Sequence, residues 1–180
     1  MRPQIAVLLH NIRSAHNVGS IFRTAEAAGA QKMYLSGHTP APIDRFGRVQ
    51  KDIAKTALGA ERILSWGQST SPYGIIAKLK KDGWMIVGVE QDTRAIDYRK
   101  FSARGGSSSG GKLKKPTLFI FGNEVRGISP ALRAKCGTLI EIPMHGSMVR
   151  QAHHPRHTKR GKESLNVSVS AGIVLFTVSS

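Results

Sequence analysis

The stretch LFIFGNEVRGIS, residues 118–129, decides the predicted fold. Its apolar part belongs to a run, Thr117–Phe121, that is typical of a short buried strand, and Gly122 ends that strand. Comparable strands are predicted elsewhere, at Ile5–Leu9, Lys32–Leu35, Trp84–Val89 and Thr138–Ile142. Helices are predicted between them, at Val18–Ala30, Pro72–Lys81, Pro130–Lys135 and Leu165–Val178. This alternation predicts an α/β fold, with a parallel sheet covered by helices on both faces.

The length of 180 residues predicts a single domain spanning residues 1–180. Residues 37–50 are rich in proline and glycine and predict a loop. Two further segments predict flexible loops within the domain. Residues 102–115 are rich in glycine and serine and end in lysines, whereas residues 147–162 are polar, histidine-rich and strongly basic.

The charge balance restricts the class of partner. Lys and Arg number 27 against 11 acidic residues, a net charge of +16, which favours a polyanion such as RNA. The chain has no apolar run long enough to cross a membrane and no apparent secretory signal. A single cysteine, Cys136, excludes an internal disulfide, so a cytoplasmic protein without membrane association is expected.

The first candidate motif is NVGSIFRTAEAAG, residues 17–29. Asn17 precedes the predicted helix as a plausible N-cap, Arg23 lies nearly two turns along it, and Gly29 closes it. An arginine on this alanine-rich helix could bind a phosphate through two hydrogen bonds. The alternative is that Asn17 only caps the helix and Arg23 is a solvated surface residue.

The second motif is the turn after the central strand, from Gly122 through Asn123 to Glu124. Ligands of open α/β sheets bind beyond the carboxyl ends of the strands, where glycine allows close approach of the backbone. The turn lacks the glycine patterns of dinucleotide-binding and phosphate-binding loops. A nucleotide-binding oxidoreductase is disfavoured because the glycine fingerprint is also missing after Ile5–Leu9. Taken alone, it is an ordinary end of a strand.

The third motif has two parts, IEIPMHG at residues 140–146 and ESLNVSVSAGIVLF at residues 163–176. Pro143 ends a strand and turns the chain outward. Ser164 and Asn166 stand at the start of a predicted helix, where side chains and free N–H groups can meet a ligand or merely cap the helix.

Together, in this order and spacing, the motifs resemble the signature of the SpoU (TrmH-like) branch of the SPOUT RNA methyltransferases. The resemblance covers nearly the whole chain apart from the two loops. It implies a deep trefoil knot in the C-terminal half, a homodimer, and S-adenosylmethionine (SAM) as cofactor. The implied reaction transfers a methyl group to a ribose 2′-hydroxyl of tRNA or rRNA, without a metal.

The resemblance also assigns residues to roles. Cofactor contacts are implied for Phe121, Gly122, Asn123, Ile142, Pro143, Met144 and Leu165. The catalytic set comprises Asn17, Arg23, Glu124, Ser164 and Asn166. A pKa above about 12 makes Arg23 an awkward base, so holding the 3′-phosphate and orienting the hydroxyl is physically easier. Asn17 and Asn166 are expected to position groups, Ser164 to bond near the ribose, and Glu124 to shape the site or pair with Arg23.

The sequence departs from the family pattern between Gly146 and Ser164, which are 18 positions apart and usually lie close together. This insertion is expected either to grip RNA or to loop passively into solvent. A zinc site from His153, His154 and His157 lacks a fourth ligand and is disfavoured. Two other functions stay open: a catalytically silent RNA-binding protein of the same fold, and a SPOUT base methyltransferase.

Overall fold

The computed structural model describes residues 4–101, 113, 115–145 and 164–179. The loop predicted at 147–162, with its histidines, lies outside these ranges, as does nearly all of the loop predicted at 102–115. In the latter, Leu113 is described and is buried. No helix in the described ranges is long and apolar enough to span a membrane.

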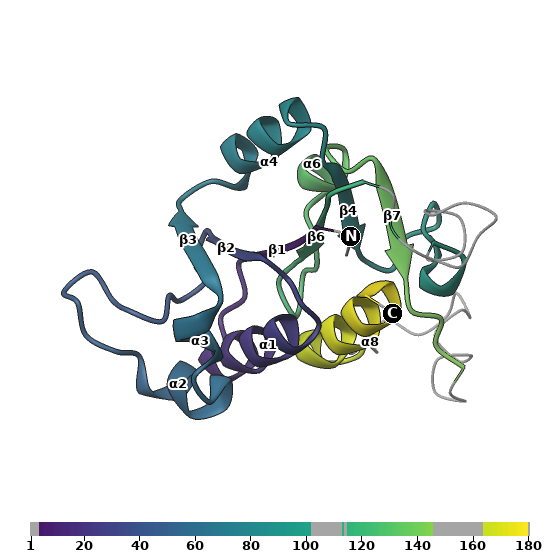
Figure 1. Cartoon of the computed structure of the whole chain (residues 1–180). Coiled ribbons are helices and arrows are strands. Elements are labelled where there is room, and N and C mark those ends of the chain that lie inside the picture. Colours follow the sequence, from purple (N-terminus) through teal and green to yellow (C-terminus); the bar gives the residue numbers. More distant parts are fainter. Residues whose placement is uncertain (1–3, 102–112, 114, 146–163, 180) are drawn as a thin grey trace.

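Seven parallel strands form one sheet at the centre of the molecule (Figure 1). Their order across the sheet is β3-β2-β1-β6-β4-β7-β5, and every pairing is parallel. The strands are β1 (Ile5–His10), β2 (Lys32–Ser36), β3 (Ser65–Ser69), β4 (Met85–Val89), β5 (Ile96–Asp97), β6 (Thr117–Phe121) and β7 (Thr138–Glu141). The predicted α/β class and parallel sheet are therefore confirmed.

Helices cover both faces of the sheet, as expected (Figure 1). The helices α4 (Pro72–Lys81) and α6 (Pro130–Arg133) lie on one face. The other face carries α1 (Ala15–Ala27), α2 (Lys51–Ala57), α3 (Ala60–Ile63) and α8 (Val167–Ser179). The alternation of strand side chains builds the two cores: Val7 of β1 packs in the α1 and α8 core, whereas its neighbour Leu8 packs in the α4 and α6 core.

The strand at the centre of the sheet, β6, is buried along its whole length. It pairs with β1 on one side and with β4 on the other. Both of its faces are covered, which explains its continuous apolar sequence. Its last residue, Phe121, leads directly into Gly122 and the second motif.

The helix of the first motif begins earlier than predicted. Helix α1 starts at Ala15, and Ser14 is its N-cap: the Ser14 hydroxyl accepts a hydrogen bond from the Asn17 backbone N–H at 3.2 Å. The prediction that Asn17 caps this helix was therefore wrong, and its side chain is available for other contacts. Gly29 follows the helix with φ of +77°, the left-handed backbone that closes many helices.

Candidate active site

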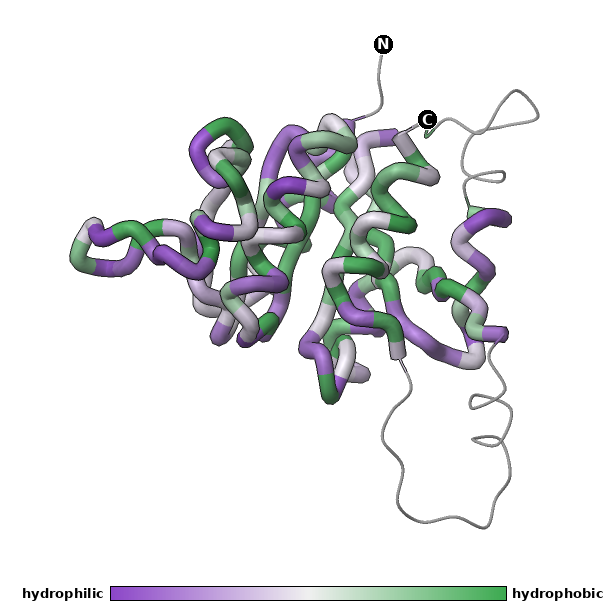
Figure 2. The backbone as a smooth tube through the Cα atoms, turned by 90° about the horizontal axis from the view of Figure 1, so that it is seen from below, coloured by the Kyte–Doolittle hydropathy of each residue, from purple (hydrophilic) through white to green (hydrophobic). Residues whose placement is uncertain are grey.

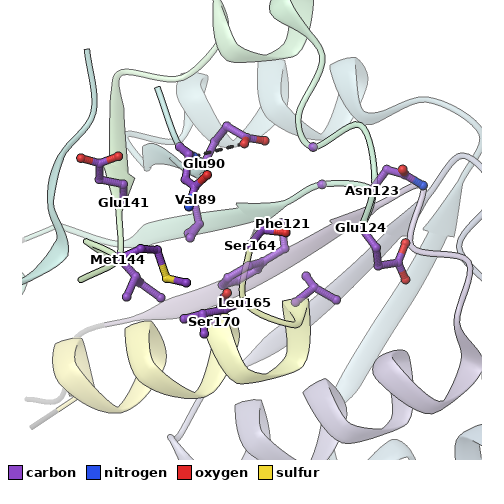
Figure 3. Close-up of a pocket in the computed structure, with 15 residues that line it drawn as sticks. Val89, Glu90, Phe121, Asn123, Glu124, Glu141, Met144, Ser164, Leu165 and Ser170 are labelled. Atoms are coloured by element: carbon purple, nitrogen blue, oxygen red, sulfur yellow. Dashed lines mark hydrogen bonds between the residues drawn. The ribbon is translucent and has the colours of Figure 1, made fainter. Parts of the chain in front are cut away.

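A pocket lies at the carboxyl edge of the sheet, between the ends of β4, β6 and β7 and the start of α8 (Figure 3). Its enclosed volume is about 90 Å³. Typical small-molecule sites measure roughly 300–1,000 Å³, so a nucleoside-sized molecule would lie only partly within it. The lining residues are Val89, Glu90, Gln91, Phe121, Gly122, Asn123, Glu124, Gly127, Glu141, Ile142, Met144, Ser164, Leu165, Val167 and Ser170.

The second and third motifs converge on this pocket. Of the seven residues with predicted cofactor contacts, the structure places all except Pro143 in the lining. Two residues of the predicted catalytic set, Glu124 and Ser164, also line it. Residues more than 40 positions apart in the sequence thus form one site.

The turn after β6 has a compact backbone. Gly122 packs so tightly that a Cβ atom there would lie 2.5 Å from the carbonyl carbon of Gly127. Asn123 holds the turn from within, because its Oδ1 accepts hydrogen bonds from the backbone N–H groups of Val125 and Arg126. Its Nδ2 donates to the carbonyl oxygen of Asn11 at 2.9 Å, which ties the turn to the end of β1. Glycine is therefore required at position 122 by the close backbone approach.

Two acidic pocket residues, Glu90 and Glu141, were not predicted from the sequence. Glu90 directly follows β4 and Glu141 ends β7, so their positions at carboxyl ends of strands could have identified them. The Glu90 carboxylate accepts a 2.6 Å hydrogen bond from the Ile128 backbone N–H. It thereby secures the far end of the turn that contains Glu124.

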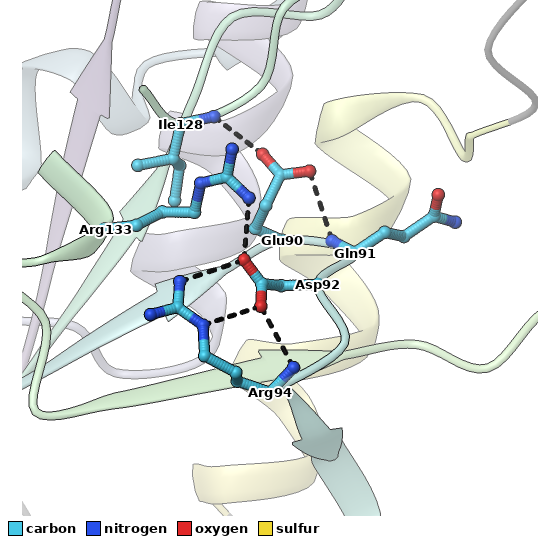
Figure 4. A network of polar contacts seen from close by, with 6 residues as sticks. All are labelled: Glu90, Gln91, Asp92, Arg94, Ile128 and Arg133. Carbon is cyan, nitrogen blue, oxygen red and sulfur yellow. Dashed lines mark hydrogen bonds and ion pairs between the residues drawn. The ribbon is translucent and has the colours of Figure 1, made fainter. Parts of the chain in front are cut away.

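An ion-pair network supports the segment that follows Glu90 (Figure 4). The Asp92 carboxylate accepts hydrogen bonds from the side chains of Arg94, at 3.0 Å and 3.1 Å, and of Arg133, at 2.7 Å. Hydrogen bonds from Arg94 lower the pKa of Asp92 well below its usual range, with a further contribution from Arg133. This network fastens α6 to the chain beyond β4, next to the pocket.

Glu124 connects the second motif to the first. Its Oε1 accepts hydrogen bonds from the backbone N–H of Ser14 and from the Asn17 side chain, both at 3.3 Å. Its Oε2 lies 3.5 Å from the backbone nitrogen of Arg13. A carboxylate near the free N–H groups at the start of α1 is also favoured by the helix dipole. Among the described residues of this chain, no ion pair joins Glu124 to Arg23.

Asn166 connects the third motif to the first. Its Nδ2 donates to Asn17 Oδ1 at 3.1 Å, and its Oδ1 accepts from the Ser168 backbone N–H at 2.8 Å. The second bond is the N-cap interaction expected at the start of α8. Asn166, Asn17 and Glu124 thus form a continuous hydrogen-bonded row, and Asn166 caps α8 and contacts the first motif without lining the pocket.

Arg23 stands apart from the rest of the predicted catalytic set. It lies on α1, is exposed to solvent, and is not among the residues lining the pocket. It lies nearly two turns of helix after Asn17, on a face of α1 that the described residues leave exposed. Within a single chain, the site is therefore assembled without its predicted phosphate-binding residue.

A second, wider hollow adjoins the pocket. This groove encloses about 880 Å³ and shares Asn123, Glu124 and Gly127 with the pocket. Its other lining residues are His10, Asn11, Arg13, Ser14, Asn17, His38, Val125, Arg126, Ser129 and Pro130. Arg13 and Arg126 bring positive charge to the groove, which favours an anionic molecule, and its width suits a larger molecule than the pocket admits.

His10 lies at the groove in a fixed neutral form. The Asn11 side-chain amide donates to its Nε2 at 2.9 Å, so Nδ1 carries the proton and donates to the Ser36 hydroxyl at 2.9 Å. Burial lowers the pKa of His10, and the nearby His38 lowers it further. Protonation of His10 at Nε2 would remove the lone pair that accepts the hydrogen bond from the Asn11 side-chain amide.

This environment predicts a pH-dependent stability. An unfolded histidine has a pKa of 6.5, so below that pH the unfolded chain binds a proton that the folded chain resists. The free energy of unfolding should therefore fall as the pH drops below 6.5, by at most about 1.4 kcal/mol per pH unit for this group. The variant His10→Gln should show a weaker decline. Urea unfolding at about pH 7.5 and about pH 5.5 measures the fall in the free energy of unfolding for each protein. An equal fall in the parent and in His10→Gln would show that His10 is not its source.

The described ranges also contain one thiol and several side chains of types that can bind a metal. Burial raises the pKa of the Cys136 thiol to about 11, so the thiolate is rare at neutral pH. The described residues contain no cluster of three or more histidine, cysteine or acidic side chains that could hold a metal ion.

A pocket at the carboxyl edge of a parallel α/β sheet is the usual place of a ligand-binding site in this class of protein, and the adjoining groove carries two arginines. Comparison with known proteins identifies the family. Residues 4–149 match the model of the SpoU rRNA Methylase family, and the chain belongs to this family.

Similar proteins agree with this assignment. The chain is 29% identical over 174 residues to the 23S rRNA (guanosine-2′-O-)-methyltransferase RlmB of Ralstonia nicotianae, covering 97% of this chain and 57% of that protein. The RlmB protein of Neisseria meningitidis is 28% identical over 173 residues, with 96% and 57% covered. The chain thus spans a little over half the length of these relatives.

Solved structures show the same fold. The AdoMet-bound rRNA methyltransferase from Sinorhizobium meliloti superimposes with a TM-score of 0.76 at 24% identity, covering 98% of this chain and 56% of that one. The SpoU methyltransferase AviRb from Streptomyces viridochromogenes, in complex with AdoMet, gives 0.74 at 24% identity, covering 98% and 60%.

Proposed function

We propose that the protein is a SAM-dependent methyltransferase that modifies a ribose 2′-hydroxyl of tRNA or rRNA. The observation that carries this proposal is the adjacency of the pocket and the basic groove, which meet at Glu124. The pocket would hold the methyl donor, and the groove would hold the acceptor nucleotide. Family membership, the rRNA 2′-O-methyltransferase relatives and the AdoMet-bound similar structures support this division.

The lining of the pocket suits SAM. Apolar side chains of Val89, Ile142 and Leu165 offer a surface for an adenine ring, and Gly122 adds backbone without a side chain to the lining. The acidic Glu90 and Glu141 complement the positive charges of this cofactor. Because the enclosed volume is small, the reactive end of the cofactor would extend toward the groove at Glu124.

Bound SAM supplies a methyl group on a cationic sulfur, which is a good leaving group and requires no metal. The chain must orient the 2′-oxygen, accept its proton as the new carbon–oxygen bond forms, and exclude competing water. Arg23 would hold the adjacent 3′-phosphate, and Ser164 would hydrogen-bond near the ribose. The row of Asn17, Glu124 and Asn166 would keep α1, α8 and the turn after β6 in register.

The proposal includes a homodimer. Helix α8 is apolar on nearly all sides, and an apolar surface of this kind is normally covered. Its buried side packs on α1, whereas Val169 and Phe176 are 48% and 51% exposed. A second copy covering this surface would lie beside the exposed face of α1 that carries Arg23. The trefoil knot in the C-terminal half and a cytoplasmic location are parts of the same proposal.

Two measurements test the function. Calorimetry with SAM should show binding to the parent protein. Mapping of 2′-O-methyl positions in total RNA, with and without the protein, should reveal at least one site that depends on it. A protein that binds RNA but not SAM would instead be a catalytically silent member of the family. Methylated bases in place of methylated riboses would identify a base methyltransferase.

A further inference from the structure

A small hairpin projects from the body of the protein on the loop between β2 and α2 (Figures 1 and 2). It comprises residues 43–49, is closed by an antiparallel bridge between Ile43 and Val49, and is called the hairpin below. In Figure 2 it extends from the left side, with hydrophilic and hydrophobic residues interspersed. The hairpin lies outside the three sequence motifs, so the functions predicted for those motifs do not explain it.

The turn of the hairpin is held by Asp44. Its Oδ1 accepts hydrogen bonds from the backbone N–H groups of Phe46 at 2.8 Å and Arg48 at 2.9 Å. Its Oδ2 accepts from the Arg48 guanidinium at 2.8 Å. The bonds from Arg48 and Phe46 lower the pKa of Asp44, so the carboxylate stays charged at neutral pH. The tip is thus preorganised, which lowers the entropic cost of binding.

The tip presents an aromatic ring together with two guanidinium groups. Phe46 is 66% exposed, and the Cζ atoms of Arg45 and Arg48 lie 4.7 Å and 5.0 Å from its ring centroid. Arg48 is paired with Asp44, whereas Arg45 forms no ion pair with the described residues. Covering the exposed phenyl ring with a partner would remove apolar surface from water.

We propose that the hairpin binds an unpaired nucleotide of the RNA, with Phe46 stacking on the base and Arg45 contacting a phosphate. Aromatic rings and guanidinium planes are the groups on which splayed RNA bases stack. The base of the loop also belongs to the groove, since the His38 backbone N–H donates to Asn11 Oδ1 at 3.0 Å. The hairpin leaves the carboxyl end of β2, on the same edge of the sheet as the pocket. One RNA strand could therefore be held both at the groove and at the hairpin.

This inference rests on the proposed function, because it specifies that the RNA carries a single-stranded segment near the methylated nucleotide. The test measures the dissociation constants of a labelled oligouridylate of about 12 nucleotides and of an RNA duplex of equal length. Phe46→Ala should weaken binding of the single strand by about 5- to 150-fold, and binding of the duplex much less. Phe46→Tyr should retain affinity.

Arg45→Ala should act differently from Phe46→Ala. Loss of one phosphate contact on the single strand should reduce the magnitude of the slope of log affinity against log salt by about 0.7, whereas loss of stacking should leave that slope unchanged. Ile63→Ala is the matched control: Ile63 is 73% exposed but lies on α3, so its variant should bind RNA like the parent.

The outcomes separate the two proposals. If the parent neither binds RNA nor methylates it, the proposed function fails. If the parent methylates RNA and Phe46→Ala binds the single strand as tightly as the parent, only the hairpin proposal fails. If Phe46→Ala changes the oligomeric state in sedimentation without changing RNA affinity, the hairpin is a contact between copies of the chain, and the RNA role is overturned.

Discussion

Replacing Arg23 with alanine is expected to reduce methyl transfer by about 10²-fold or more, because the reacting hydroxyl would no longer be held in position. The affinity for SAM should be unchanged, since Arg23 does not line the pocket. Turnover of total RNA and calorimetry with SAM measure the two quantities. Arg62→Ala provides a control, because it removes an exposed positive charge from another helix. Unchanged turnover in Arg23→Ala would refute the assigned role.

A complementation experiment then determines whether Arg23 serves its own pocket or that of a second copy. Arg23→Ala and Asn166→Ala subunits would be co-expressed and their mixed dimers assayed. If each site combines Arg23 of one subunit with Asn166 of the other, a mixed dimer contains one intact site, and random pairing restores roughly one quarter of the parent activity. If each site lies within one chain, every site carries a defect and activity stays at the level of the separate variants.

Gly127→Ala is expected to reduce both stability and SAM binding strongly. Gly127 has φ of +65°, a conformation that costs a residue with a side chain about 1–3 kcal/mol. Its added methyl group would overlap the Glu90 carboxylate, which holds the Ile128 backbone N–H. The carboxylate must then move, leaving that N–H without its partner and displacing the turn that carries Glu124. Thermal unfolding and calorimetry with SAM measure these losses.

The control for this variant is Gly83→Ala. Gly83 has a similar φ of +80°, but no atom lies within 4 Å of the position that its added methyl group would take, so only the backbone strain is added. It should lose about 1–3 kcal/mol of stability and keep its affinity for SAM. An equal effect of both variants on SAM affinity would show that the contact between Gly127 and Glu90 does not shape the pocket.

The elements that could be predicted from sequence are those with strong apolar patterns. Strands β1, β4, β6 and β7 are short apolar runs, and they were predicted to within one residue at either end. The polar strand β3, with sequence SWGQS, was missed because it lies at an edge and pairs only with β2. Helices α2 and α3 were also missed, since they are short and joined by two residues with left-handed backbone, Leu58 and Gly59.

The arrangement of the candidate site was harder to predict from nearby sequence than the strands and helices. The residues around Gly122 and Ile142 were identified as possible pocket residues from the resemblance, and the structure brings them together. Asn17 was wrongly predicted to be the N-cap because Ser14 and Asn17 are both favourable capping residues. Only contacts with Glu124 and Asn166, each more than 100 positions away, determine what its side chain does. No local pattern contains that information.

The position of β6 between β1 and β4 has a consequence for synthesis of the chain. Strand β1 ends at His10, but its partner on one side is not complete until Phe121. During translation, β1 and β4 therefore each expose an unpaired apolar edge until Phe121 has been synthesised. Such edges are templates for aggregation, and pairings between distant segments form slowly. The centre of the sheet, and with it the pocket, is thus a late product of folding.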